Sequence, residues 1–543
     1  MHAITQNVVT EWSFVSSRTY PDPFNDVELD VVFAGENGKQ MRVPAFWAGD
    51  SVWRVRFSSA ESGAFGYRTV CSDQGNPDLH GIEGSFQVTP YTGSNPIYRH
   101  GPIRAAADRR HFEHADGTPF FWLADTQWMG LCKRLSWPED FQTLTNDRAR
   151  KGFSVVQIVA GPYPDMTQFD ERGANEAGYA WTDDLSRVNP AYYDMADRRI
   201  AYMVDRGLVP CVVGCWGYYL EEMGVDRIKK HWRNLIARYG AYPVVWCAAG
   251  EAAMPFYSYS GDRREYDSRI RSQWTDVVRY IRELDPFRRA IGIHPTCGPT
   301  PASKCGHSQV DEAGLLDFDM LQTGHGGHHD LPSALATLQY ALDHEPRMPV
   351  INSESCYEGI LEMNREEIQR LLFWTSVLSG AAGHTYGANG IWQVNRVEKP
   401  YGPSPHGSSW GDRPWQEAMA LAGSTCLGLG KRLLERYEWW RFEPHQDWID
   451  CCQIGIYNAD HAPFFVPRAA GIPGKVRVIY TSPLLGRVER VKSIEPDARY
   501  RAFYFNPSNA AEIEVGAVVP NESGEWRPPA PPIFRDWVLV LES

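Results

Sequence analysis

Several features are scarce in or missing from this 543-residue sequence, and a basic region is the first of them. The net charge is −13, and no long run of Lys or Arg occurs along the chain. Nucleic acid binding requires a basic footprint that neutralises phosphates. The sequence therefore predicts no nucleic acid partner and favours a neutral substrate.

Long apolar runs and cysteine pairs are also missing. The segment from Met1 to Glu11 has neither a basic stretch nor an apolar stretch of signal-peptide length, and no 18-residue apolar run occurs. The 11 cysteines are odd in number and form no CxxC pair, which predicts reduced, mostly buried thiols. We therefore expect a cytoplasmic protein with no membrane partner. Oligomeric state is left open, with a homo-oligomer as one alternative.

Aromatic residues, in contrast, are abundant. They make up 13% of the chain and include 20 Trp and 26 Tyr. Much of this set fills the core, but an indole face also stacks on the apolar face of a sugar ring. An excess of this size favours a carbohydrate ligand.

The two ends of the chain share one pattern. Residues 1–100 contain short alternating segments such as Trp53–Phe57, separated by turns rich in Gly, Asn and Pro. Residues 433–543 repeat the pattern, with segments such as Val476–Tyr480 and a Pro-rich turn at 528–532. Short strands at regular spacing with such turns are typical of β-sandwiches. We predict an N-terminal β-sandwich over 1–100 and a C-terminal one over 433–543.

Residues 101–432 alternate apolar strands with helical stretches, such as 192–206 and 270–284. Strand–helix alternation implies a parallel sheet, and eight units imply a closed (β/α)₈ TIM barrel. A doubly wound open sheet is the alternative, but no Gly-rich dinucleotide fingerprint supports it. The predicted strands are 119–124, 153–160, 208–215, 244–249, 290–294, 319–322, 349–353 and 381–386.

Active-site residues of such barrels lie at the carboxyl ends of the strands. Glu251 and Glu354 follow the apolar runs of the fourth and seventh strands, so they should face each other across the barrel mouth. Glycoside cleavage needs a carboxylic acid that protonates the leaving oxygen and a carboxylate that attacks or directs water. The two residues are therefore the predicted catalytic pair. The alternative is that one of them pairs with a barrel arginine.

Other polar and aromatic residues follow the same strands. We expect them to bind a neutral sugar through stacking and hydrogen bonds. For Asp125 a second interpretation, capping of the following turn, is equally good, and Trp392 fits packing between barrel and sandwich as well. The predicted substrate-binding residues are Asp125, Gln157, Trp216, Gln322, His325, His384, Tyr386 and Trp392, and His294 ends a strand in the same way.

One loop offers a different chemistry. His325, His328 and His329 lie between glycines and Asp330, and clustered imidazoles with a carboxylate are ligands that Zn²⁺ prefers. Their spacing matches no known metal motif, and glycines this dense suggest backbone close to a ligand. We predict no metal and no cofactor, and we keep a metal-dependent hydrolase and a non-catalytic carbohydrate-binding protein as alternatives.

These motifs together resemble the apiosidase-like glycoside hydrolases, whose barrel often follows a small β domain of unknown function and precedes a collagen-binding-like β-sandwich. The matching segments are 23–28, 43–47, 95–102, 116–126, 148–153, 353–359 and 383–387. They are spread over nearly the whole chain.

The resemblance implies a retaining mechanism, with Glu354 as nucleophile and Glu251 as acid/base. The family pattern has Asp where this chain has Glu251, and one extra methylene moves the carboxyl group by about 1.5 Å. A carboxyl group in this shifted position suits a leaving group or a sugar ring that differs from those of the apiosidase pattern. The expected activity is an exo-acting glycosidase that releases a terminal sugar, with a pentofuranose as one candidate.

Overall fold

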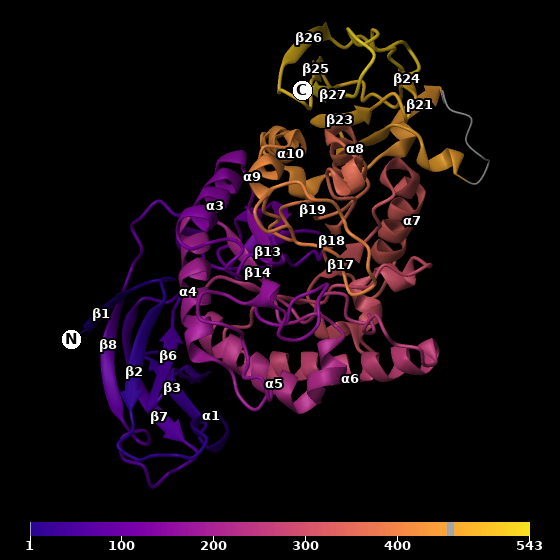
Figure 1. The fold of residues 1–543 in the computed structure, drawn as a ribbon. Helices are drawn as coiled ribbons and strands as arrows, with labels where there is room; N and C mark the ends of the chain where they lie inside the picture. The colour runs from indigo at the N-terminus through magenta and orange to yellow at the C-terminus, as the bar shows by residue number, and fades with distance from the viewer. Residues whose placement is uncertain (1, 453–460) are drawn as a thin grey trace.

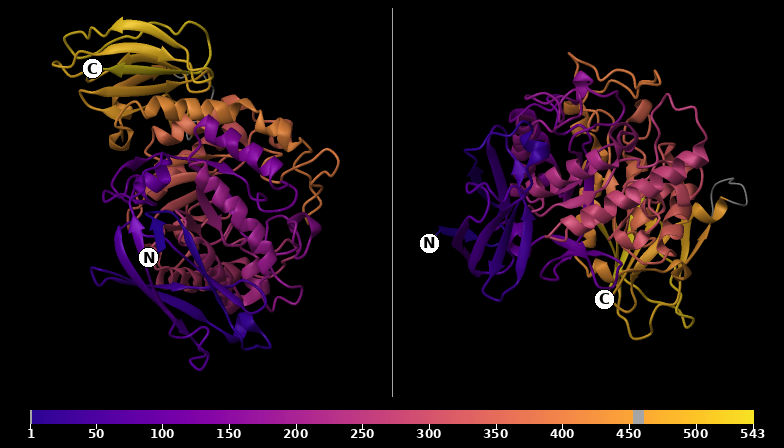
Figure 2. Two further views of the ribbon diagram at one scale, coloured as in Figure 1. Left: turned by 90° about the vertical axis from the view of Figure 1, so that its left-hand side faces the viewer. Right: turned by 90° about the horizontal axis from the view of Figure 1, so that it is seen from below.

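The computed structural model describes residues 2–452 and 461–543. Three parts follow one another along the chain (Figures 1 and 2): β-sheets at the N-terminal end, a central barrel surrounded by helices, and β-sheets at the C-terminal end. The barrel therefore lies between the two β-rich parts.

The N-terminal part consists of two facing sheets. Phe33 of one sheet stacks on Phe57 of the other, with ring centroids 4.1 Å apart. The predicted β-sandwich is present. One sheet has the order β1-β8-β7-β3-β4, with β1 (His2–Thr5), β3 (Leu29–Gly35), β4 (Gln40–Pro44), β7 (Gly63–Cys71) and β8 (Glu83–Thr89); the other has the order β2-β6-β5, with β2 (Thr10–Val15), β5 (Phe46–Trp47) and β6 (Val52–Phe57).

The central sheet has eight strands, and all seven of its neighbouring pairs are parallel. At the seam between β16 and β17, the Asp317 amide donates to the Ile291 carbonyl at 2.8 Å. The predicted (β/α)₈ architecture is confirmed. The strands are β12 (Trp122–Thr126), β13 (Val155–Val159), β14 (Val209–Val213), β15 (Val245–Cys247), β16 (Ile291–Gly292), β17 (Asp319–Gln322), β18 (Val350–Glu354) and β19 (Gly383–Tyr386).

Helices cover the outside of these strands (Figure 1). Strands such as β13 and β14 are buried on both faces, which explains their continuous apolar sequence. The helices are amphipathic: α6 buries Ile270, Trp274, Val277 and Ile281 on one face. Those of the barrel are α3 (Glu139–Lys151), α4 (Pro190–Asp205), α5 (Tyr219–Tyr239), α6 (Arg263–Leu284), α7 (Leu331–Leu342), α8 (Glu366–Val377), α9 (Trp415–Met419) and α10 (Ala422–Leu434); α1 (Pro23–Asp26) and α2 (Pro96–His100) precede it.

A small antiparallel sheet leads into the barrel. It comprises β9 (Ile103–Ala105), β10 (Phe112–His114) and β11 (Pro119–Phe120). Its Phe112 packs on Trp122, at the start of β12, with ring centroids 5.1 Å apart. This contact places the small sheet at the amino end of the barrel, away from the strand ends that carry the predicted site.

The C-terminal part packs on the barrel through one apolar sheet face. Trp374 of α8 stacks on Tyr480 at 6.0 Å, and Arg370 pairs with Asp536 at 2.5 Å. The second face packs against a two-stranded sheet, so this end is also a β-sandwich. The larger sheet has the order β20 (Glu443–Pro444), β22 (Arg468–Ile472), β23 (Val476–Thr481), β27 (Trp537–Glu542), β25 (Arg501–Phe505), β26 (Glu512–Ala517); the smaller is β21 (Ile449–Cys452) with β24 (Arg487–Val491). The boundaries at 100 and 432 stay a prediction.

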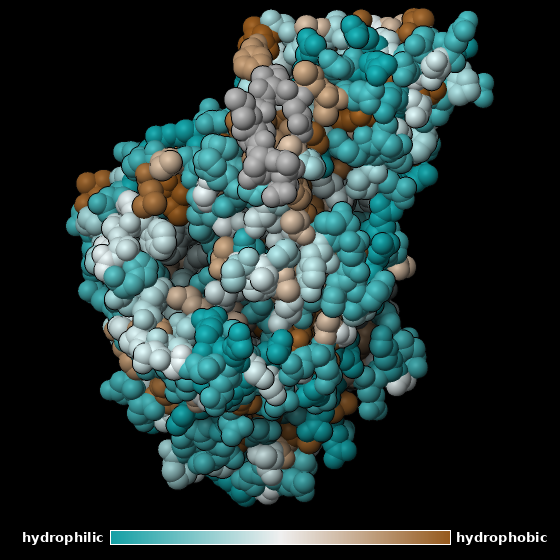
Figure 3. Space-filling model, turned by 90° about the vertical axis from the view of Figure 1, so that its right-hand side faces the viewer, coloured by the Kyte–Doolittle hydropathy of each residue, from teal (hydrophilic) through white to brown (hydrophobic). Residues whose placement is uncertain are grey.

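The molecular surface has few hydrophobic residues. The face drawn in Figure 3 is mostly hydrophilic, with hydrophobic residues scattered over it. Eight of the eleven cysteines are buried, as predicted. Among the described residues, no helix combines the length and the apolar character needed to cross a membrane.

Candidate active site

Glu354 is the last residue of β18, the seventh barrel strand. Its Cα pairs with that of Gln322 at the end of β17, after a register shift between Leu321 and Gln322. The Thr323 amide donates to the Glu354 carbonyl at 2.8 Å. The two strand ends are therefore held together, and the Glu354 side chain is only 5% exposed.

Glu251 lies just beyond β15, the fourth strand. The backbone there has a positive φ of 42°, a conformation that costs a non-glycine residue about 1–3 kcal/mol and that clusters at active sites. Gly217 permits this path, because a Cβ atom at that position would lie 2.2 Å from the Glu251 carbonyl oxygen. The close approach of these two backbones fixes where the Glu251 carboxyl group is presented.

Two neutral donors bind the Glu251 carboxyl group. The Gln322 amide donates to Oε1 at 3.1 Å, and the Trp216 indole donates to Oε2 at 3.3 Å. Since Gln322 is also the strand partner of Glu354, one residue connects the two predicted catalytic carboxyl groups.

Different groups surround Glu354. His325 Nε2 lies 3.0 Å from Oε1, and His294 Nε2 lies 3.3 Å from Oε2. Tyr357 completes the set: its ring lies 4.5 Å from that of His325, and its hydroxyl accepts a hydrogen bond from Trp128 at 3.1 Å. Glu354 is thus next to cationic or polar donors, whereas the donors to Glu251 among the described residues are an amide and an indole.

These environments separate the pKa values of the two carboxyl groups. Burial, followed by the charge of Glu354, raises the pKa of Glu251 to about 7. Burial alone would raise the pKa of Glu354 as well, but the hydrogen bond from His325, the charge of His294 and the Tyr357 hydroxyl lower it below its usual value. At neutral pH the site therefore holds one carboxyl group that is protonated about half of the time and one that is ionised, a division that suits proton transfer combined with nucleophilic attack.

Two further predicted residues lie close to this pair. Gln157 is fully buried inside the barrel, where its amide donates to the carbonyl of Ser353, the residue before Glu354, at 3.0 Å. Trp392 is 6% exposed, and its ring centroid lies 6.4 Å from that of Tyr357. Gln157 therefore holds the end of β18 from inside the barrel, whereas Trp392 belongs to the aromatic residues around Glu251 and Glu354.

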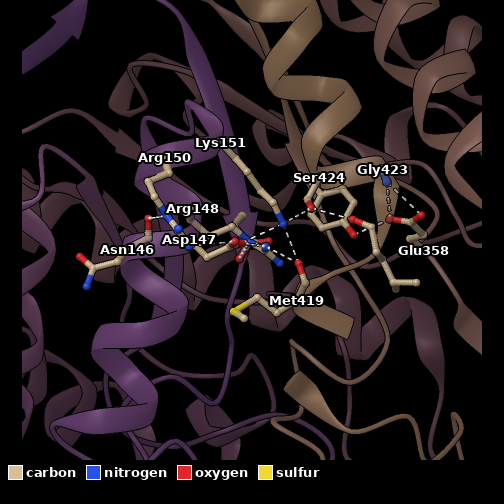
Figure 4. Close-up of polar contacts among 12 residues, drawn as sticks. Asn146, Asp147, Arg148, Arg150, Lys151, Glu358, Met419, Gly423 and Ser424 are labelled. Atoms are coloured by element: carbon tan, nitrogen blue, oxygen red, sulfur yellow. Dashed lines mark hydrogen bonds and ion pairs between the residues drawn. The ribbon is translucent and has the colours of Figure 1, made fainter. Parts of the chain in front are cut away.

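Three predicted residues face the opposite way. Asp125 pairs with Arg148 of α3 at 2.8 Å, and the Tyr386 hydroxyl donates to Glu358, whose carboxylate also accepts the Gly423 amide of α10. Figure 4 shows part of this network, with Arg148 and Lys151 pointing toward α10. His384 packs edge-on against Phe373 of α8. The structure brings none of the three to the carboxyl pair, because they lie on the helix-facing side of their strands.

Several residues near the site were missed by the sequence reasoning. Tyr357 lies within the segment 353–359 that resembles the family, but no role was predicted for it. Trp128 lies three residues after Asp125, so nearness to a strand end was its only signal. Two others come from loops: Tyr257 donates to Asp165 at 2.8 Å, and Asp165 Oδ2 is buried without a hydrogen-bond partner in the described part of the chain. No sequence pattern indicated these loop positions.

The loop histidines do not assemble into a metal site. His325 contacts Glu354, whereas His328 and His329 pack on each other with ring centroids 4.0 Å apart. Over residues 2–452 and 461–543, the one group with the spacing of metal ligands is Cys305, His307 and Asp319. There, His307 Nδ1 and Asp319 Oδ2 contact each other at 2.6 Å.

The chain matches two family models. Residues 106–441 match the apiosidase-like catalytic domain, and residues 4–72 match a domain of unknown function, DUF5060. No curated protein sequence matches the chain significantly.

Solved structures show the same fold at low identity. A glycoside hydrolase matches with 21% identity and a TM-score of 0.66, over 83% of this chain and 99% of its own. A family 5 glycoside hydrolase from Bacteroides vulgatus has the same identity and TM-score, over 83% and 94%. A third structure, from Bacteroides vulgatus and provisionally named a glycoside hydrolase, matches with 17% identity and a TM-score of 0.68 over 100% of both chains. The model of the apiosidase-like catalytic domain covers more than half of the chain, and its match includes both strand-end carboxyl groups. The protein therefore belongs to the apiosidase-like family of glycoside hydrolases.

Proposed function

We propose that the protein is a retaining exo-glycosidase, with Glu354 as the nucleophile and Glu251 as the acid/base. The observation that carries this proposal is the contrast between the contacts of the two strand-end carboxyl groups: an amide and an indole bind Glu251, whereas His325 and His294 lie against Glu354. These contacts set the two pKa values apart. An ionised Glu354 can attack the anomeric carbon while a protonated Glu251 donates to the leaving oxygen. In the second step, Glu251 accepts a proton from the water that hydrolyses the glycosyl-enzyme.

The contacts around the pair fit these two roles. His325, whose pKa the hydrogen bond to Glu354 helps to raise to about 10 although burial opposes the shift, stabilises the negative charge on Glu354 before attack. His294 Nε2 lies 3.3 Å from the other oxygen of Glu354. The donors to Glu251 are neutral, so they hold its carboxyl group in place without forcing it to ionise. Exchanging the roles would require Glu354 to hold a proton next to the cationic imidazole of His325, which electrostatics disfavours.

Contacts among three loops support cleavage at a chain end. Tyr257, which follows β15, bonds to Asp165 in the loop after β13 and packs on His406 in the loop after β19, with ring centroids 5.3 Å apart. Tyr401 of the last loop donates to the Pro164 carbonyl at 3.4 Å. Loops tied together beside the strand ends leave less room for a polymer to pass through, which favours release of one terminal sugar.

The sugar itself is best found by screening. The family suggests a pentofuranose, whereas Glu251 in place of Asp suggests a different ring or leaving group. Aryl glycosides of pentofuranoses and common pyranoses should be tested first. Product analysis on an oligosaccharide series then tests the exo mode: early monosaccharide supports it, and a ladder of intermediate oligomers contradicts it.

Covalent trapping tests the mechanism directly. A 2-deoxy-2-fluoro derivative of the best substrate should accumulate as a glycosyl-enzyme, and peptide mass spectrometry should locate the label on Glu354. The Glu354→Gln variant is the matched control and should remain unlabelled. A label on another residue, or an inverted first product by NMR, would exclude the proposed mechanism.

A further inference from the structure

A cavity of about 500 Å³ lies between the barrel and the C-terminal part. Its wall includes Val350, the first residue of β18, whereas Glu354 is the last residue of that strand. Four residues of strand span roughly 13 Å. The cavity therefore lies at the amino end of the barrel and is separate from the candidate active site.

Arginines dominate the charge of this cavity. Arg109, Arg110, Arg347 and Arg468 line it, and they come from the β9–β10 turn, the loop before β18 and the start of β22. The acidic residues in the wall are Asp343 and Glu443. The cavity thus carries two positive charges in excess, in a chain whose net charge is −13.

Most of these guanidinium groups have no acidic partner. Arg110 pairs with Glu443 at 2.9 Å, and Asp343 instead accepts a hydrogen bond from the Gln339 amide at 2.9 Å. Over residues 2–452 and 461–543, the other three arginines of the wall form no ion pair. Like charges that share a cavity repel each other unless an anion lies between them.

Arg468 is the most constrained of the set. Its Nη2 donates to the Phe464 carbonyl at 3.0 Å, but its Nε is buried and has no hydrogen-bond partner in the described part of the chain. Burial lowers the pKa of this guanidinium to about 10, and no nearby carboxylate opposes the shift. A buried donor on an unpaired cation is unfavourable unless a ligand supplies the missing acceptor.

We propose that this cavity is a second ligand site that binds a sugar unit bearing an oxyanion: a carboxylate, sulfate or phosphate. The planar guanidinium fork matches the geometry of these groups and binds them through paired hydrogen bonds. The volume is within the range of small-molecule sites and exceeds the space that a bare ion fills. A ligand here is held behind the barrel, so it anchors an acidic saccharide without entering the reaction.

Isothermal titration calorimetry with three probes tests the site and its ligand class. Glucuronate should bind saturably with one site per chain, inorganic sulfate should bind more weakly, and glucose should give no saturable heat. Equal affinities for sulfate and glucuronate would keep the oxyanion site but overturn the sugar unit. Equal affinities for glucose and glucuronate, or no saturable binding of glucuronate, would overturn the oxyanion site.

Single substitutions locate the binding. Arg347→Gln and Arg468→Gln should each weaken glucuronate binding by about tenfold, since hydrogen bonds to charged groups contribute about that much. Arg99→Gln is the matched control: Arg99 is exposed, lies outside the cavity and makes the same change in net charge. Arg347 is also exposed, so its variant should fold even if Arg468→Gln does not.

Turnover of an aryl glycoside gives an independent readout. Both cavity variants should keep wild-type kcat/KM, because the cavity lies at the other end of the barrel. Unchanged glucuronate affinity in Arg347→Gln would overturn the assignment of the site to this cavity, whatever the fate of the proposed mechanism.

Discussion

Two clusters of buried ionisable residues lie at the ends of barrel strands, and they differ in whether their carboxyl groups pair with arginine or lysine. Behind β12 and β19, Asp125 and Asp147 both pair with Arg148, at 2.8 and 2.7 Å. Lys151 also pairs with Asp147, at 2.9 Å, so two carboxylates face two cations (Figure 4). At the mouth, neither Glu251 nor Glu354 has an arginine or lysine partner among the described residues, and their proton affinities are separated instead. The ion pairs of the first cluster should contribute to stability, whereas the proposed function assigns proton transfer to the carboxyl pair.

The difference between the clusters predicts opposite results for substitutions. A change at the mouth should reduce the rate and leave stability nearly unchanged, whereas a change in the paired cluster should do the reverse. The predictions below proceed from the largest expected effect to the smallest.

Glu354→Gln should lower kcat/KM by at least about 10⁴-fold, because the amide cannot attack the anomeric carbon. The urea midpoint of unfolding should stay close to that of the wild type. Stopped assays with an activated aryl glycoside measure the first quantity, and circular dichroism the second. Turnover within tenfold of the wild type would remove Glu354 from the mechanism.

Glu251→Gln should have an effect that depends on the leaving group. Poor leaving groups need protonation, so their kcat/KM should fall by about 10²–10⁴-fold. Nitrophenolate needs little help, and its glycosylation step should be nearly unaffected. A plot of rate against leaving-group pKa tests this, and equal losses for all leaving groups would contradict the acid role.

Arg148→Met should lower the free energy of unfolding by about 3–5 kcal/mol, because it leaves Asp125 buried without its partner. Arg150→Met is the matched control on the same helix, since that side chain is 76% exposed and should contribute under about 1 kcal/mol. Adding Asp125→Leu to Arg148→Met should recover part of the loss. If the single variant lost activity but not stability, the contrast between the clusters would fail.

The pH dependence of kcat/KM tests the protonation states proposed for Glu251 and Glu354. Activity requires a protonated Glu251 and an ionised Glu354, so kcat/KM should decline as pH rises through about 7. The acid limb should lie below the usual pKa of a glutamate, because the pKa of Glu354 is lowered. Measurement of kcat/KM from pH 3 to 9 locates both limbs.

Trp216→Phe should produce the smallest effect. The indole hydrogen bond favours the ionised form of Glu251, so its loss should raise the pKa of Glu251 and move the alkaline limb to higher pH. The acid limb should not move, since Trp216 makes no hydrogen bond to Glu354 in the described residues. A shift of the alkaline limb to lower pH would mean that the indole acts in another way.

The sequence predicted the barrel, and the positions of Glu251 and Glu354 at the ends of two of its strands, because both depend on local pattern. The catalytic roles of the two residues stay a prediction. An apolar run that ends in Glu251 or Glu354 places a charge at the strand end, and the order of the strands places the two on opposite sides of the mouth. The side of a strand on which a side chain lies could not be predicted in the same way. In strands buried on both sides there is no polar alternation to read, so Tyr386 and His384 could not be assigned to the outer face.

Residues that enter the site from loops could not be predicted from the pattern of strand ends. Asp165 and Tyr257 lie 92 positions apart and meet only because the loops after β13 and β15 fold toward each other. Asp125 is the reverse case, a residue that was predicted to bind substrate because it lies at the end of its strand. Its partner is Arg148 on a helix, and spacing alone did not indicate that pairing.

The shared core between α8 and the C-terminal sheet bears on protein engineering. Trp374, Tyr480 and the Arg370–Asp536 pair belong to one packed layer that continues from the barrel into the terminal domain. A truncation before residue 443 would uncover apolar helix faces and leave Arg370 without its acidic partner. The terminal domain is therefore a poor target for deletion or for exchange with another domain.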